Sequence, residues 1–80
     1  MKLPRDLSGR ELARALARLG YEIDRQPGSH IRLTTQRGGE HHVTVPAHAQ
    51  LKVGTLNGVL RDVAEHAHLD RDELLDLLFG

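Results

Sequence analysis

The chain opens with a pattern of apolar residues that predicts a helix. Four of them recur at the spacing of one helix face: Leu12, Ala15, Leu16 and Leu19. Ser8 and Glu11 have the spacing of a capping box, in which each side chain accepts a hydrogen bond from the other residue's backbone N–H group. Leu7 can pack on Leu12 across this start, and Gly20 is placed to end the helix.

Three short segments of alternating apolar and polar residues follow, and this period of two predicts β-strands. They comprise residues 21–25, 30–35 and 40–45. One side of each segment is apolar and is expected to be buried: Tyr21 and Ile23, Ile31 and Leu33, Val43 and Val45. Residues 26–29 and 36–39 have the composition of turns. Pro46 is expected to end the third strand, because proline has no N–H group for a sheet ladder.

The second half of the chain predicts two further helices. Gly54 and Thr55 open the first, whose apolar residues keep the helical period: Leu56, Val59, Leu60, Val63 and Ala67. The last, residues 70–79, begins with Asp70 as cap and Glu73 three residues later. It is acidic, yet it is apolar on nearly all sides: Leu74, Leu75, Leu77, Leu78 and Phe79. We expect one side to rest on the preceding helix. The remainder either meets a second copy of the chain or another protein, or folds back on the same domain.

The order α-β-β-β-α-α indicates one α+β domain over residues 1–80, with a core of residues 7–69 and an additional C-terminal helix. Its two layers are an antiparallel sheet and the helices that cover one of its faces. The uncovered sheet face is expected to display alternate polar residues of the three strands: Glu22, Asp24, His30, Arg32, Thr34, Glu40, His42 and Thr44.

Composition excludes several classes of protein. The 80 residues contain no cysteine, which excludes disulfide-stapled modules and thiolate zinc fingers. No apolar run suits a signal peptide or a membrane span, so we expect no membrane association and a cytoplasmic location. Residues 1–39 carry eight Lys/Arg and four Asp/Glu, whereas residues 40–80 carry three and seven. A polyanion would be attracted to the first half, unless this sorting is chance.

Three short motifs occur in order along the chain. Gly20-Tyr21 is followed by Arg25-Gln26-Pro27-Gly28-Ser29-His30, Val43-Thr44-Val45-Pro46 by His48, and Leu51-Lys52-Val53-Gly54-Thr55-Leu56 leads into the second predicted helix. With the predicted architecture, these motifs resemble the HicA (YcfA-like) toxin family over most of the chain. The resemblance implies a fold like that of double-stranded-RNA-binding domains, ribonuclease activity on messenger RNA (mRNA), and a HicB-type antitoxin as partner. It also implies one functional histidine in the Gly-Ser-His turn, here His30. The chain departs from many members at Ile31, where they have a second histidine, and in its acidic last helix.

The chemistry of His30 fits this implied activity. A histidine exchanges protons near neutral pH, and RNA supplies its own nucleophile in the 2′-hydroxyl group. A general base beside that hydroxyl promotes attack on the adjacent phosphorus, so neither a metal nor another cofactor is expected. Whether His30 acts as base, acid or both is left open. Arg32, two residues further along the same face, is the candidate phosphate clamp.

Other basic residues are candidate RNA contacts. Arg10 and Arg14, with Arg18, form a basic stripe at four-residue spacing, which suits phosphates, an acidic antitoxin surface, or simply a solvated face. Lys52 precedes the second predicted helix, where a phosphate could bind. His42 has the outward parity of His30 and is either an RNA contact or a solvated strand residue.

Three other hypotheses compete with that of a metal-free nuclease. The pairs His41-His42 and His66-x-His68 invite a metal site, but adjacent strand residues face opposite ways and an i,i+2 pair shares no helix face. The chain could also be a non-catalytic RNA-binding module or a protein-interaction module of the same fold. A cleavage assay and the salt dependence of RNA affinity separate these functions.

Overall fold

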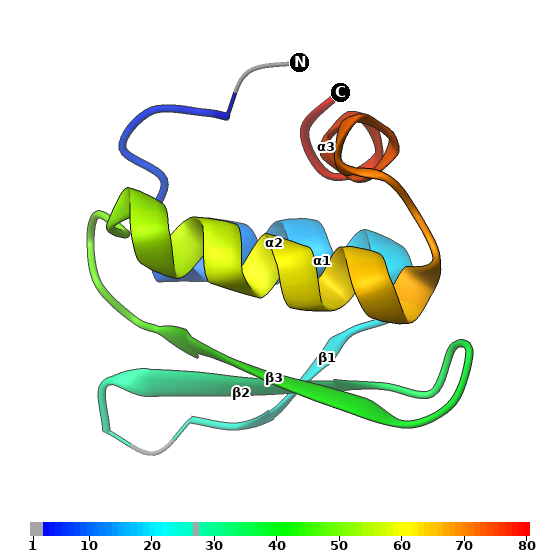
Figure 1. Ribbon diagram of the computed structural model, residues 1–80. Helices are drawn as coiled ribbons and strands as arrows, with labels where there is room; N and C mark the ends of the chain where they lie inside the picture. Colours follow the sequence, from blue (N-terminus) through cyan, green and yellow to red (C-terminus); the bar gives the residue numbers. More distant parts are fainter. Residues whose placement is uncertain (1–2, 27) are drawn as a thin grey trace.

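The helices and strands follow the predicted order in the computed structural model, which describes residues 3–26 and 28–80. They are α1 (Gly9–Leu16), the 3-10 helix η1 (Ala17–Leu19), β1 (Glu22–Arg25), β2 (His30–Thr35), β3 (His41–Pro46), α2 (Val53–Ala67) and α3 (Arg71–Phe79). Figure 1 shows α1 and α2 on one side of the sheet, with α3 beyond them on the side away from the sheet. The predicted α+β two-layer architecture with an additional C-terminal helix is confirmed.

The two predicted capping boxes are also confirmed. The Ser8 hydroxyl accepts from the Glu11 N–H at 3.0 Å, and the Glu11 carboxylate accepts from the Ser8 N–H at 2.9 Å. The bond from the Ser8 backbone lowers the pKa of Glu11, because it stabilises the charged carboxylate. Asp70 and Glu73 form the same reciprocal pair before α3. Gly20 ends η1 with a φ of 82°, a left-handed conformation that favours glycine.

The sheet is antiparallel with the order β1-β2-β3. Its alternation is as predicted in β2 and β3, where every second residue is buried under the helices: Ile31, Leu33, Val43 and Val45. Three strand bounds differ by one residue from the predicted ones, since Tyr21 precedes β1, Glu40 precedes β3, and β3 includes Pro46. Likewise α2 begins at Val53, one residue before the predicted start. In the predicted turn 26–29, Pro27 lies outside the described residues.

The expectation that Ile23 is buried is wrong. Its side chain is 58 % exposed, although its pairing partner Leu33 is fully buried. β1 is an edge strand, and its register with β2 shifts between Ile23 and Arg25. Helix α1 packs mainly on β2 and β3, so that the helical layer does not extend over β1. Ile23 therefore lines an open groove between α1 and the sheet edge.

Helix α3 belongs to the core of the same domain. It packs on both α1 and α2, and Leu74, Leu75 and Leu78 are buried there. Phe79 is partly buried, and Leu77 is 44 % exposed. We predicted that some apolar side chains of this helix could meet a second copy or a partner. Only Leu77 remains well exposed for such a contact, because the other leucines fold back on the domain. None of the helices in the described residues is long and apolar enough to cross a membrane.

Candidate functional site

His30 is an exposed residue at the start of β2. It lies opposite Pro46 in β3, and the residue before it, Ser29, accepts a hydrogen bond from the Ala47 N–H at 2.7 Å. Within the described residues, the His30 imidazole makes no hydrogen bond or ion pair. Both of its ring nitrogens are therefore available to a ligand or to water.

Several segments converge at this end of the sheet. The Gly9 N–H at the start of α1 donates to the His48 carbonyl at 3.0 Å, just after β3. Figure 1 shows the starts of α1 and α2 at the same end of the molecule as the connection between β1 and β2. His48 is exposed and lies next to Ala47, which is bonded to the turn before His30. The motif containing His48 was visible in the sequence, but its proximity to His30 depends on the pairing of β2 with β3.

Arg32 shares the open sheet face with His30, about 7 Å further along the strand. Its Nε atom lies 3.6 Å from an Asp24 carboxylate oxygen, and both side chains are about half exposed. The same Asp24 oxygen accepts from the Thr34 hydroxyl at 3.1 Å. A guanidinium has five N–H donors, so this pair orients Arg32 and leaves donors for a second anion.

His42 lies on the same face but at the far end of it. It is opposite Thr34, whereas His30 is opposite Pro46, which separates the two histidines by about 13 Å along the sheet. His42 Nδ1 is 2.7 Å from the Thr34 hydroxyl, and Nε2 is 3.0 Å from the Glu40 carboxylate. The structure does not bring His42 to the His30 site, so its role as an RNA contact stays a prediction.

The basic stripe on α1 divides into two parts. Arg18 donates to the Leu77 carbonyl at 3.0 Å, and this bond ties it to α3. Arg10 and Arg14 are exposed and form no ion pair with a described residue. They line a groove of about 460 Å³ that also includes Gln26, in the turn before His30, and Ile31, the residue after His30. The groove therefore reaches the turn before His30 on the helix-covered side of the sheet, whereas His30 itself faces the open side.

Lys52 is the N-cap residue of α2 and is exposed. No side chain of the described residues caps this helix start. The backbone N–H groups of its first turn are therefore without the side-chain acceptor that Ser8 and Asp70 supply to the other two helices. Lys52 adds a positive charge at the same position.

A second polar cluster lies on the covered side of the sheet. His41 faces the helices while His42 faces away, as the alternation predicts. The His41 Nε2–H donates to the Asp62 carboxylate at 3.2 Å, which leaves Nδ1 to accept from the Tyr21 hydroxyl at 2.7 Å. Burial raises the pKa of Tyr21 to about 12, and the negative charge of Asp62 adds to this. The His66 ring stacks on His41 with centroids 4.3 Å apart.

This cluster pins β3 to α2, and its imidazoles are engaged in it. The His66 Nε2–H donates to the Arg37 carbonyl at 2.9 Å, and both nitrogens of His41 have partners. Among the described residues, no group of three or more His, Asp or Glu side chains is arranged to hold a metal ion.

Fold and site together define a small α+β domain with an exposed histidine at one end of an open sheet face, whose imidazole makes no hydrogen bond or ion pair with another described residue. A sequence model of the family described as HicA toxin of bacterial toxin-antitoxin matches residues 9–64, from the start of α1 into α2. This chain belongs to the HicA toxin family of bacterial toxin–antitoxin systems. Helix α3 lies outside the match. Nothing matches the chain among curated proteins or among solved structures.

Proposed function

We propose that the chain is a toxin that cleaves mRNA, with His30 as its catalytic residue and without a metal ion. The observation that supports this most is the state of the His30 imidazole, which is exposed and has no partner among the described residues. A structural histidine is engaged, as His41 and His66 are in this fold. Because the chain belongs to the HicA toxin family, an exposed imidazole without a described partner is a candidate catalytic group of a toxin.

The reaction follows from the chemistry of RNA and imidazole. His30 takes the proton of a 2′-hydroxyl group, whose oxygen attacks the adjacent phosphorus. The new O2′–P bond forms as the P–O5′ bond breaks, and the departing 5′-oxygen takes up a proton from solvent. The products are a 2′,3′-cyclic phosphate and a 5′-hydroxyl end.

Cationic residues around His30 bind the RNA backbone and stabilise the charge that develops on the phosphorus. Arg32 is the nearest of them on the open face, held in place by Asp24. Arg10 and Arg14 line the groove leading to the turn before His30, and Lys52 adds charge at the start of α2. RNA binding is therefore mainly electrostatic, consistent with the single Tyr and single Phe of the chain.

A HicB-type antitoxin neutralises the toxin by covering the open sheet face around His30 and Arg32 in the cytoplasm. An antitoxin on this face keeps RNA away from the imidazole, since β2 presents both side chains there. Hydrogen exchange of the toxin, free and bound to antitoxin, tests this directly. Unchanged exchange in residues 28–33 on binding would indicate an indirect mechanism.

The decisive experiment compares wild type with His30→Gln in RNA cleavage with EDTA present. We expect wild type to leave 2′,3′-cyclic phosphate ends and His30→Gln to be inactive. The variant should change the free energy of unfolding by less than about 0.5 kcal/mol, because the side chain is exposed. His68→Asn is the matched control, since His68 is exposed and asparagine tolerates its left-handed backbone.

Three outcomes would contradict this function. Full activity in His30→Gln removes His30 from the chemistry. Activity that is lost with EDTA and returns with zinc or magnesium contradicts the metal-free mechanism. Salt-dependent RNA binding by wild type without cleavage assigns the chain to a non-catalytic RNA-binding module instead.

A further inference from the structure

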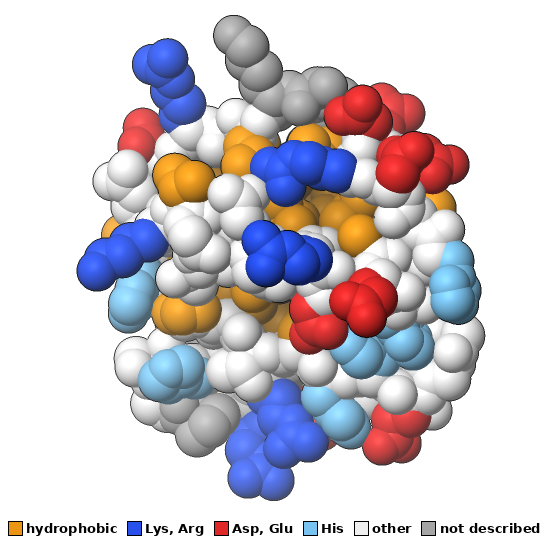
Figure 2. All heavy atoms as spheres, viewed as in Figure 1, with side chains coloured by type: hydrophobic (Ala, Val, Ile, Leu, Met, Phe, Trp, Pro, Cys, Tyr) orange, Lys and Arg blue, Asp and Glu red, His pale blue; other side chains and the backbone are white. Residues whose placement is uncertain are grey.

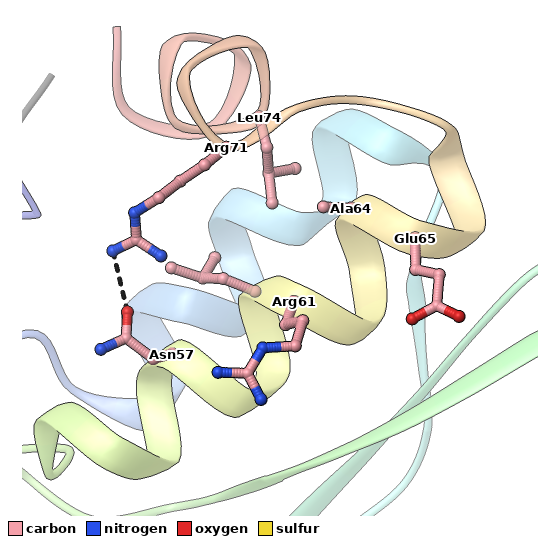
Figure 3. A pocket seen from close by; sticks show the side chains of 7 residues that line it. Asn57, Arg61, Ala64, Glu65, Arg71 and Leu74 are labelled. Carbon is pink, nitrogen blue, oxygen red and sulfur yellow. Dashed lines mark hydrogen bonds between the residues drawn. The ribbon is translucent and has the colours of Figure 1, made fainter.

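A groove of about 550 Å³ runs between α2 and α3, on the helical side of the molecule (Figure 3). Seven residues line it: Asn57, Leu60, Arg61, Ala64, Glu65, Arg71 and Leu74. Leu60 and Leu74 lie beneath the groove and are almost fully buried, whereas Ala64 is partly exposed in its lining. The groove is separate from the open sheet face that carries His30.

Two arginines line this groove. Arg71 reaches from α3 to α2, where its guanidinium donates to the Asn57 side-chain oxygen at 2.8 Å (Figure 3). Arg61 lies one turn further along α2. Both are exposed, and neither forms an ion pair with a described residue. Two of the three basic residues of the acidic second half of the chain are therefore gathered at one groove.

This arrangement suits carboxylates beside aliphatic side chains. A guanidinium binds a carboxylate through two parallel hydrogen bonds, and Arg71 is already oriented by Asn57. The partly exposed Ala64 and the aliphatic stems of the two arginines can pack against an apolar side chain of a docked helix or extended segment. Figure 2 shows two basic side chains next to exposed apolar surface, with acidic side chains to their right.

The acidic surroundings disfavour RNA as the occupant. Glu65 lies in the groove wall, and α3 carries Asp72, Glu73 and Asp76. A polyanion that followed the groove would meet these charges, whereas a short segment with a local carboxylate pair would not. The charges thus select a protein segment over a nucleic acid.

We propose that this groove binds a segment of the antitoxin that carries carboxylate side chains next to an aliphatic one. The proposal rests on the antitoxin partner of the proposed function. The groove holds the antitoxin at a point remote from His30, while another part of the antitoxin covers the sheet. Attachment at two points raises the affinity beyond that of either contact, because the second contact forms at a high effective concentration.

The test uses a HicB-type antitoxin that neutralises the wild-type toxin, and measures its binding to toxin variants in the His30→Gln background by titration calorimetry. We expect Arg61→Glu and Arg71→Glu each to weaken binding at least tenfold, and Asn57→Ala to weaken it less. Arg61→Lys and Arg71→Lys keep the charge but lose the paired hydrogen bonds, so they should be intermediate. Arg5→Glu is the matched control, an exposed arginine outside the groove.

RNA cleavage, measured for the same groove substitutions with His30 restored and no antitoxin present, separates this proposal from the proposed function. We expect unchanged cleavage, because the groove residues lie outside the His30 site. If wild type does not cleave RNA, the proposed function is wrong. The binding measurements still test whether the groove binds the antitoxin. The groove proposal is overturned if Arg61→Glu and Arg71→Glu bind the antitoxin like wild type, if Arg5→Glu weakens binding equally, or if these variants lose RNA affinity instead.

Discussion

Gly9 and Pro46 approach so closely that a β-carbon on Gly9 would overlap the Pro46 carbonyl oxygen. The first turn of α1 therefore lies directly on the end of β3, opposite the start of β2 where His30 stands. The Gly9 N–H bond to the His48 carbonyl fixes the same contact. Glycine at this position thus determines how the basic helix meets the candidate site.

Gly9→Ala should consequently destabilise the fold by about 2 kcal/mol, since the obstructing atoms are backbone and cannot rotate away. Gly58→Ala is the matched control. Gly58 is exposed in α2 with nothing near its β-carbon position, and alanine favours the helix by about 0.5–1 kcal/mol. Urea unfolding of the two variants should shift the midpoint in opposite directions. Equal stability of Gly9→Ala and wild type would contradict the close contact.

The raised pKa of Tyr21 predicts that the folded protein loses stability at alkaline pH. Its pKa is raised from 10.0 to about 12 by burial and by Asp62, so folding favours the neutral phenol that donates to His41. This contribution is complete below pH 10, where the unfolded chain also keeps the proton, and is lost as pH rises through 12. The free energy of unfolding should fall across that range in wild type.

Tyr21→Phe should abolish that fall and cost about 1 kcal/mol at neutral pH through the lost hydrogen bond. Tyr21 is the only tyrosine, so the alkaline absorbance change of the folded protein reports on it alone. A titration midpoint near the ordinary value would contradict the buried assignment.

The division of the basic stripe predicts unequal effects of neutral substitutions on RNA binding. Arg10→Gln and Arg14→Gln should each weaken RNA affinity. Each should also reduce the slope of log affinity against log salt by about 0.7, the value for one phosphate contact on a single strand. Arg18→Gln removes the same charge, but that side chain is bonded to Leu77 and should leave the slope unchanged. Equal slopes for all three variants would show that the groove has no special part in binding.

The sequence predicted the elements of this fold because its signals are local. Both capping boxes, the left-handed Gly20 and the alternation of β2 and β3 involve residues within a few positions of one another. The burial of Ile23 was predicted wrongly, because the alternation rule assumes that the helical layer covers the strand along its whole length. The position of α1 over β2 and β3, and the register shift in β1, are tertiary features.

The candidate site was predictable only in part for the same reason. The parity of His30 and Arg32 follows from the strand period, and it is observed. Other features depend on pairings between distant segments. These are the contact of Asp24 with Arg32, the separation of His42 from His30, and the hydrogen bond from Arg18 to α3. No local pattern indicated that Arg61 and Arg71 would lie at one groove.

Helix α3 is expected to act as part of the folded core and not as a removable tail. Leu74 is fully buried against α1 and α2, so Leu74→Ala should cost about 2–5 kcal/mol, a large share of the stability of a small domain. Leu77→Ala deletes the same atoms from a side chain that is 44 % exposed and should cost far less. Thermal unfolding compares the two.

RNA cleavage measured below the unfolding transition then separates stability from activity, because α3 carries no residue of the His30 site. Both variants should cleave at the wild-type rate per folded molecule. If Leu77→Ala is instead the more destabilised variant, α3 is held by an association through that exposed leucine, and stability should then depend on protein concentration.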